Sequence, residues 1–307
     1  FQPDLIHLCS PALMSVNGMA VGRALNIPVL ANYQTDLPGY AIQYGYSLLS
    51  EPLRSWLRYL HNGCHVNLVP SQAILSDLKA NGFRRLHIWE RGVNIERFNP
   101  KHRSQTMRES LLAGRDPNAL LVIYVGRLAT EKCVDLLRDI ADLEGIALTI
   151  IGDGQLKEDL EAQFAGTGTV FTGYLYGDDL ATAFASADVF VFPGANETFG
   201  QVVQEALASG LPGIVTERGG VHERIEQGQT GWVVDHNQAA FAEAVRRLRD
   251  DRTLLKQMSA QARCYAEARP WSAIMAQLEQ YYASALERSS RFEQLFGYTT
   301  YHQPLSI

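Results

Sequence analysis

Two short segments of the sequence combine cations, carboxylates and glycines in a spacing that suits an anionic ligand. The first runs Gly126-Arg127-Leu128-Ala129-Thr130-Glu131-Lys132 and follows the apolar run 120–125. Gly126 permits a tight exit from a strand. Arginine offers a phosphate a fork of donors and lysine offers a point charge, so Arg127 and Lys132 suit a diphosphate. A solvated surface loop is the alternative interpretation.

The second segment runs from Glu197 to Glu205 and follows the apolar run 189–192. Val202, Val203, Ala206 and Leu207 have the spacing of one buried helix face. A helix that begins near 198–200 leaves free N–H groups and the positive end of its dipole there, which favour an anion. The residues expected to hold the phosphate and the sugar are Glu197, Thr198, Phe199, Gly200 and Gln201.

The spacing of the two glutamates argues against a glycosidase. Eight helical residues span roughly 12 Å, whereas the carboxyl pair of a glycosidase lies only about 5–10 Å apart. Glu197 and Glu205 therefore suit a long ligand, such as a sugar nucleotide, with the sugar at one end and the ribose at the other. The alternative is that Glu205 serves only to balance charge within the helix.

Further candidates follow other apolar runs. Gly152 and Gly154 flank Asp153 at one strand end, where a structural turn and a ligand loop fit equally well. Tyr174 and Leu175 follow another strand end, where a nucleotide base could stack; an aromatic residue at the edge of the core is the alternative interpretation. The candidates on the acceptor or sugar side are Gln34, Asp36, Arg91 and Asn94. The chain has no Asp-x-Asp pair, and His61 and His65 lack metal-spaced partners, so no metal and no cofactor is expected.

The composition excludes several classes of protein. The 307 residues carry a net charge of −6, which leaves no basic excess for general nucleic-acid binding. The four cysteines are scattered, which favours reduced thiols in a cytoplasmic protein. No run of 18 apolar residues occurs. The chain opens on what reads as a strand already inside a domain, so we expect the natural N-terminus to be missing.

Short apolar runs alternate with helical patterns along the chain, which predicts parallel sheets in an α/β fold. The expected domains are a partial Rossmann-like domain at 1–105, a complete doubly wound domain at 106–270, a helix at 271–290 that packs back on the first domain, and a tail at 291–307 without a helical stripe. Open parallel sheets bind ligands at the carboxyl ends of their strands. Two such sheets that face each other would form a binding cleft.

Three motifs, in this order and at these separations, resemble retaining GT-B glycosyltransferases of the GT4 type. They are Gly126-Arg127-Leu128 with Glu131-Lys132, then Gly152-Asp153-Gly154, then Glu197-x7-Glu205 followed by Ala206-Leu207-Ala208-Ser209-Gly210. Four segments resemble the branch of GDP-mannose-dependent α-mannosyltransferases and sulfolipid synthases: Tyr33-Gln34-Thr35-Asp36, Leu60-His61-Asn62, Val69-Pro70-Ser71 and Arg91-Gly92-Val93-Asn94.

The resemblance implies a role for each residue of the motifs. Arg127 and Lys132 would bind the donor diphosphate, Glu197 the sugar and Glu205 the ribose, with Tyr174 and Leu175 beside the base. It also implies that a sugar is transferred from GDP-mannose or a UDP-sugar to a hydroxyl acceptor. The transfer would need no metal and would retain the anomeric configuration. A lipid-linked acceptor, and membrane contact through a missing N-terminal region, are expected of this branch, which places the protein in the cytoplasm or at its membrane face.

Two departures from the family pattern keep alternatives open. Many members carry His where this chain has Gln34, and the first part of the usual N-terminal domain is absent. A non-catalytic nucleotide-sugar-binding protein is therefore one alternative to the transferase. A GT-B nucleotide-sugar epimerase, which acts on the donor without any acceptor, is another.

Overall fold

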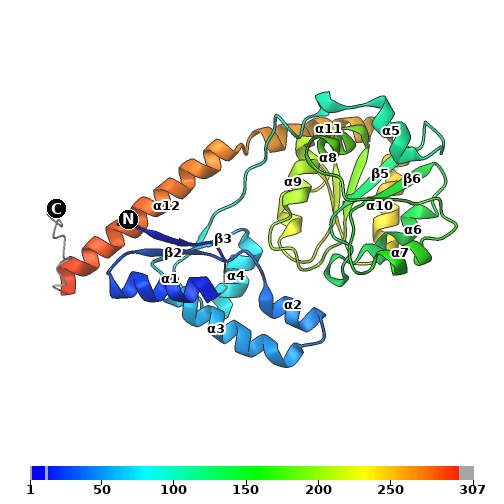
Figure 1. The fold of residues 1–307 in the computed structure, drawn as a ribbon. Helices are drawn as coiled ribbons and strands as arrows, with labels where there is room; N and C mark the ends of the chain where they lie inside the picture. Colours follow the sequence, from blue (N-terminus) through cyan, green and yellow to red (C-terminus); the bar gives the residue numbers. More distant parts are fainter. Residues whose placement is uncertain (1, 11–12, 297–307) are drawn as a thin grey trace. The chain divides into compact units, whose positions relative to one another are not determined.

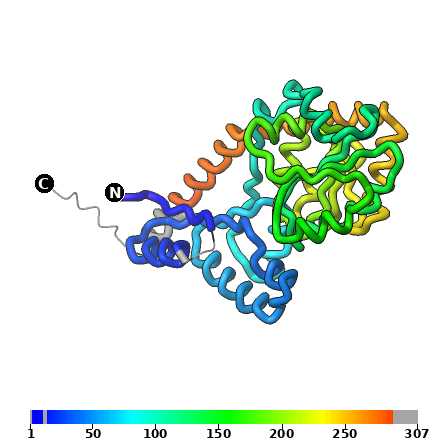
Figure 2. The backbone as a smooth tube through the Cα atoms, turned by 45° about the vertical axis from the view of Figure 1, so that its right-hand side comes forward, coloured from blue at the N-terminus to red at the C-terminus, as the bar shows by residue number. Residues whose placement is uncertain are grey.

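The computed structural model describes the backbone of residues 2–10 and 13–296 and the side chains of 2–10 and 14–287. These residues form two compact units (Figures 1 and 2). The second unit is the continuous stretch Arg91–Ala273, and the first unit combines Phe1–Glu90 with the chain from Ile274 onward. The linking segment 91–105 thus belongs with the second unit.

The second unit is built on a parallel sheet of six strands among the described residues. Its strands are β5 (Leu120–Val125), β6 (Ile146–Ile151), β7 (Val170–Gly173), β8 (Val189–Phe192), β9 (Gly213–Thr216) and β10 (Gly231–Val234). All six residues of β5 are buried, as expected for the central strand of a sheet covered on both faces.

The strand order of this sheet indicates where a ligand would bind. The order is β10-β9-β8-β5-β6-β7, so the chain moves outward from β5 to one edge and then returns to β8 to build the other half. The point between β5 and β8 is the topological switch point of a doubly wound fold, and ligands bind in the crevice outside the carboxyl ends of those two strands. The two motif segments, 126–132 and 197–205, directly follow β5 and β8.

Helices cover both faces of this sheet (Figure 1). On one face α10 (Gln238–Asp250) packs with α6 (Arg138–Ala141) near α7 (Lys157–Gln163). On the other, α9 (Gln201–Ala208) packs with α11 (Arg252–Glu267), and α8 (Gly177–Ser186) packs with α5 (Gln105–Leu112). Short 3-10 turns link these elements: η2 (Pro100–His102), η3 (Thr130–Lys132), η4 (Val134–Leu137) and η5 (Val221–Arg224).

The first unit holds a parallel sheet of four strands among the described residues, in the order β1-β2-β3-β4. The strands are β1 (Ile6–Leu8), β2 (Val29–Asn32), β3 (Val66–Val69) and β4 (Leu86–Ile88). The elements between them are α1 (Leu13–Ala24), α2 (Leu37–Gln43), η1 (Ser47–Leu49), α3 (Ser50–Asn62) and α4 (Gln72–Ala80). Ser71 caps α4, with its hydroxyl accepting from the N–H of Ile74 at 3.4 Å.

The helix α12 (Trp271–Phe296) completes the core of the first unit. Leu278 and Ala285 are buried against Leu30, Val66 and Leu68 of the sheet. The Trp89 indole N–H donates to the carbonyl of Ile274 at 3.0 Å, which fixes the start of this packing.

Two expectations about secondary structure were wrong. The tail expected to lack a helix from 291 continues α12 as far as Phe296, and 297–307 lie outside the described residues. The helix expected at 133–143 is instead the two short pieces η4 and α6. Cys133 has a left-handed backbone with φ of 51°, a conformation that cannot continue an α-helix.

Candidate functional site

The loops after β5 and β8 meet through an ion pair between the two motif segments. Lys132 Nζ lies 2.6 Å from Glu197 Oε2, and the side chains are 12% and 25% exposed. The Lys132 ammonium also lies 5.6 Å from the centroid of the Phe192 ring at the end of β8. The structure therefore brings together two residues that are 65 positions apart in the sequence, at the switch point where a doubly wound sheet binds ligands.

Arg127 presents a cation to solvent beside this pair. Its guanidinium donates to Glu131 Oε1 at 2.7 Å, and the arginine side chain is 58% exposed while Glu131 is buried. The hydroxyl of Tyr124, buried within β5, donates to the carbonyl of Arg127 at 3.0 Å. Burial and the charges of Glu197 and Glu131 raise the pKa of Tyr124, so the hydroxyl keeps its proton and holds the arginine backbone in place.

The loop that leads into α9 is held in an unusual backbone conformation. Gly200 has φ of 85°, and a Cβ there would lie 2.9 Å from Val221 Cγ2. The helix begins at the next residue, Gln201, so its free N–H groups open toward this loop. Phe199 and Thr198 are both buried. This geometry suits the anion site predicted from the sequence.

A second loop, which follows β9 and was not predicted to belong to the site, supports the first. The N–H of Gly220 donates to the carbonyl of Glu197 at 2.7 Å. Gly219 has φ of 71°, and a Cβ there would meet the Glu197 carbonyl at 2.8 Å. The buried Arg224 guanidinium stacks 4.5 Å from the centroid of the Phe199 ring. The pair Gly219-Gly220 after an apolar run was the available signal.

Glu205 lies on α9, in an environment unlike that of Glu197. The residue is partly buried, and its carboxyl group has no hydrogen bond or ion pair among the described residues. Burial raises the pKa of its carboxyl to about 7. A carboxyl group without a partner can accept hydrogen bonds from the two hydroxyls of a diol. Because Glu205 makes no ion pair among the described residues, it does not balance the charge of another side chain in the helix.

The glycines of the Gly152-Asp153-Gly154 turn have a demonstrable packing role. A Cβ on Gly152 would lie 1.9 Å from the Gly126 carbonyl oxygen, and one on Gly154 would lie 2.3 Å from that of Leu128. The carbonyl of Asp153 accepts from the N–H of Leu128 at 2.9 Å. The turn thus braces the loop that carries Arg127. Direct contact of Gly152 and Gly154 with a donor stays a prediction.

Tyr174 and Leu175 follow β7 and differ in exposure. The Tyr174 hydroxyl donates to the Asp153 carbonyl at 3.0 Å, while the side chain remains 47% exposed. Its ring lies 5.7 Å from that of Tyr176. Leu175 packs against the core of the second unit. An exposed aromatic pair at the end of a strand can stack with a base.

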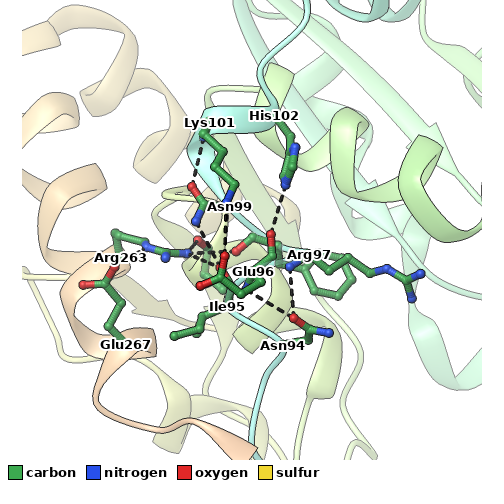
Figure 3. Close-up of polar contacts among 11 residues, drawn as sticks. Asn94, Ile95, Glu96, Arg97, Asn99, Lys101, His102, Arg263 and Glu267 are labelled. Atoms are coloured by element: carbon green, nitrogen blue, oxygen red, sulfur yellow. Dashed lines mark hydrogen bonds and ion pairs between the residues drawn. The ribbon is translucent and has the colours of Figure 1, made fainter.

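Two of the candidates for the sugar or acceptor side belong to the second unit. Burial lowers the pKa of Arg91, and the negative charge of Glu197 opposes that shift, so the two side chains lie in one electrostatic environment. The Gln201 amide donates to the Gly92 carbonyl at 3.0 Å, which ties this segment to α9. The Asn94 carboxamide oxygen accepts from the N–H groups of Glu96 and Arg97, as Figure 3 shows.

The remaining two candidates, Gln34 and Asp36, follow β2 in the first unit. Asp36 Oδ1 accepts from the N–H of Gly39 at 3.1 Å and from the Tyr33 hydroxyl at 3.3 Å. It therefore caps α2, a structural role that its sequence context did not reveal. Gln34 is partly buried. Their roles toward an acceptor stay predictions.

Within residues 2–10 and 13–296, no group of three His, Cys, Asp or Glu side chains is arranged to hold a metal ion. In the same part of the chain, no helix is both long and apolar enough to cross a membrane.

Solved structures share this fold. The chain matches the sucrose-phosphate synthase of Thermosynechococcus elongatus with a TM-score of 0.82, over 93% of this chain and 74% of that one, at 22% identity. It matches Anabaena Alr3699/HepE in complex with UDP with a TM-score of 0.79, over 92% of this chain and 79% of that one, at 20% identity. Together with the two parallel sheets, these likenesses define the chain as a GT-B protein.

The family follows from the sequence comparisons. The family model for glycosyl transferases group 1 matches residues 108–265, and that for glycosyltransferase family 4 matches 1–97. The chain therefore belongs to the group 1, family 4 glycosyltransferases.

Several of the sequence relatives fall into the branch that the motifs resemble. The chain is 40% identical to the sulfoquinovosyl transferase SQD2 of Arabidopsis thaliana over 92% of this chain and 58% of that protein. It is 44% identical to a GDP-mannose-dependent alpha-mannosyltransferase of Mycobacterium tuberculosis, over 75% of this chain and 60% of that protein. It is 38% identical to a GDP-mannose-dependent alpha-mannosyltransferase of Mycolicibacterium smegmatis, over 94% of this chain and 76% of that protein. The chain thus spans about three fifths of the length of the first two.

Proposed function

We propose that the protein transfers a sugar from a nucleoside diphosphate donor to a hydroxyl acceptor, with retention at the anomeric carbon. The observation that carries the proposal is the Lys132–Glu197 ion pair at the switch point, with Arg127 exposed beside it. Mannose from GDP-mannose is the first candidate because several relatives are GDP-mannose-dependent mannosyltransferases. Glucose or another sugar from a UDP donor is the second.

Different residues bind the diphosphate, the sugar and the ribose of the donor. Arg127, Lys132 and the free N–H groups at the start of α9 stabilise the negative charge that develops on the departing diphosphate. Glu197 holds the sugar, and Glu205 accepts hydrogen bonds from the ribose hydroxyls. The bond between the anomeric carbon and the diphosphate oxygen breaks as the acceptor oxygen bonds to that carbon. The departing phosphate takes the acceptor's proton.

The acceptor is proposed to be a glycolipid or another lipid at the cytoplasmic face of a membrane. The support is the likeness to a sulfoquinovosyl transferase and, over half of this chain, to a phosphatidylinositol dimannoside mannosyltransferase of Mycobacterium tuberculosis. Gln34, Asp36, Arg91 and Asn94 are the candidates for the acceptor and sugar side.

The test compares thermal stabilisation by GDP-, UDP- and ADP-sugars, because a ligand that binds the folded state raises its melting temperature. We expect one donor class to stabilise the protein selectively and its sugar to appear on a lipid acceptor. Selective binding without turnover would identify a non-catalytic binding protein. Conversion of the donor sugar in the absence of any acceptor would identify an epimerase.

A further inference from the structure

A groove of about 880 Å³ lies at the edge of the second unit's sheet opposite the ion-paired loops. Asn118 precedes β5, Asp188 precedes β8, and the turn Ser209–Leu211 precedes β9, so these wall residues stand at the amino ends of parallel strands whose carboxyl ends carry Lys132 and Glu197. The groove is therefore separate from the donor site. Its volume is ample for a small organic ligand.

The walls of the groove carry an excess of positive charge. Its charged lining residues are one carboxylate and four cations, namely Asp188, Arg103, Arg252, Lys256 and Arg263. The carboxylate is already neutralised, since Asp188 Oδ2 pairs with the buried Arg108 at 2.9 Å. This excess stands out in a chain with 27 Lys and Arg against 33 Asp and Glu.

The four cations are not equally available to a ligand. Arg263 donates through one nitrogen to the carbonyls of Ile95, Phe98 and Ala208, and through Nε to Glu267 (Figure 3), so it serves mainly to hold the fold. Arg103 Nη2 lies 3.5 Å from Asp188 at the rim, a loose contact.

Two cations of α11 remain available on one face of the groove. The Arg252 guanidinium makes a 3.3 Å hydrogen bond to the Asn118 carbonyl, and the Lys256 ammonium has no hydrogen bond or ion pair among the described residues. They are four residues apart on α11, so they project from the same face. Both are exposed at the mouth of the groove.

One wall residue, Ser209, is an independent sign that a bound group is absent. The Ser209 side chain is 3% exposed, and its hydroxyl has no hydrogen-bond partner among the described residues. A buried hydroxyl of this kind is usually satisfied by a water or another bound group. Apolar lining residues (Pro100, Ala185, Ala187, Leu211, Leu255 and Ala260) offer a surface for an organic moiety.

We infer that this groove binds a phosphate-bearing organic ligand, with Arg252 and Lys256 holding the phosphate and the apolar wall packing against the rest. A guanidinium fork and an ammonium are the side chains that recognise phosphate. This site is distinct from the donor site, and the inference stands whether or not the proposed transfer reaction is correct.

The test uses inorganic pyrophosphate as the probe in calorimetry, in a protein whose donor loop is disabled by Arg127→Ala and Lys132→Ala. We expect this background to retain one pyrophosphate site. Addition of Arg252→Glu and Lys256→Glu should weaken binding at least about tenfold, the loss expected for one charge-assisted hydrogen bond. The matched control is Lys79→Glu with Arg84→Glu, two exposed cations of the first unit.

A second arm distinguishes a soluble ligand from a lipid headgroup. Sedimentation with phosphatidylglycerol vesicles that depends on Arg252 and Lys256, without pyrophosphate binding, would support the site and assign the phosphate to a lipid. If the double reversal disturbs the circular dichroism spectrum, Lys256→Ala replaces it, because the Lys256 ammonium makes no hydrogen bond or ion pair among the described residues. The absence of both kinds of binding, or binding that these variants leave unchanged, would overturn the inference.

Discussion

Lys132 Nζ lies 2.6 Å from Glu197 Oε2, across the two strands at which the winding of the second sheet reverses. The pair joins a loop after β5 to the loop that opens α9. Because both side chains are largely shielded from solvent, their attraction is screened less than that of a surface pair. Each member therefore fixes the position of the other before a donor binds.

Replacement of Lys132 by alanine should lower donor turnover by about 10²–10³-fold, the loss typical when one charge-stabilising group is removed from an active site. It should also leave Glu197 without its cation. Steady-state kinetics with the preferred donor measure the effect. Lys157→Ala is the matched control, because Lys157 pairs with Asp153 at 3.2 Å after the neighbouring strand β6. Near-normal turnover in the Lys132 variant would remove this lysine from the mechanism.

Nucleotide affinity should depend on pH through Glu205. Its carboxyl has a folded-state pKa of about 7, above the ordinary value of 4.5, because burial disfavours the charged form. Ribose hydroxyls that donate to the carboxylate favour the ionised form, so affinity should rise as pH increases from about 6 to 8. Calorimetry across this range tests the prediction.

The same carboxyl sets a pH dependence of stability. Because its folded-state pKa is raised, the Glu205 carboxyl binds a proton more tightly in the folded protein than in the unfolded chain. Its contribution to the free energy of unfolding is therefore fully present below about pH 4.5 and is lost as pH rises toward 7. The loss is about 3 kcal/mol at most. Glu205→Gln should flatten both the stability profile and the affinity profile. An affinity slope that survives in this variant would assign the effect to another group.

Gly152→Ala should destabilise the second unit through a clash that no rotamer relieves. The added Cβ would lie 1.9 Å from the Gly126 carbonyl oxygen, at a φ of 144°. A cost of about 3 kcal/mol lowers the melting temperature by about 6 °C or more. Gly228→Ala is the control, since its φ is 76° but no atom lies within 4 Å of the added Cβ. Equal shifts in the two variants would mean that backbone strain, not the contact with Gly126, sets the cost.

Arg224→Met should weaken nucleotide-sugar binding about tenfold, in line with the loss of a buried cation–π contact. The guanidinium stacks on Phe199, whose backbone adjoins the expected phosphate site. Arg247→Met removes a similar contact, 4.8 Å from the Trp232 ring and outside the donor loops. Titration of the preferred donor should separate the two variants. If the Arg247 variant loses affinity to the same extent, then general stability and not the position of Phe199 explains the effect.

The sequence predicted the strands well because a strand buried on both faces is a continuous apolar run. Leu120–Val125 is the clearest example, with every residue buried. Once the strands are known, the positions of Lys132 and Glu197 follow from the rule that ligands bind at carboxyl ends. The ion pair between them could not be predicted, because it depends on the order of strands in the sheet and not on any local pattern.

Features that depend on packing between distant segments were missed. Nothing in the residues near Cys133 signals its left-handed backbone, so the 133–143 pattern reads as one helix. The support that Gly220 and Arg224 give to the donor loop comes from a segment about twenty residues further along the chain. The cap that Asp36 forms on α2 was missed as well, although it is a local contact with the N–H of Gly39.

The two units differ in how the chain enters and leaves them. The second unit is one uninterrupted stretch, Arg91–Ala273, whereas the first needs α12 from beyond that stretch to cover Leu30, Val66 and Leu68. Domains generally fold as units while the ribosome is still adding residues. The half with the donor loops can therefore fold once residue 273 has left the exit tunnel. The first sheet stays partly uncovered until α12 has been made, so its core is completed later than that of the sheet with the donor loops.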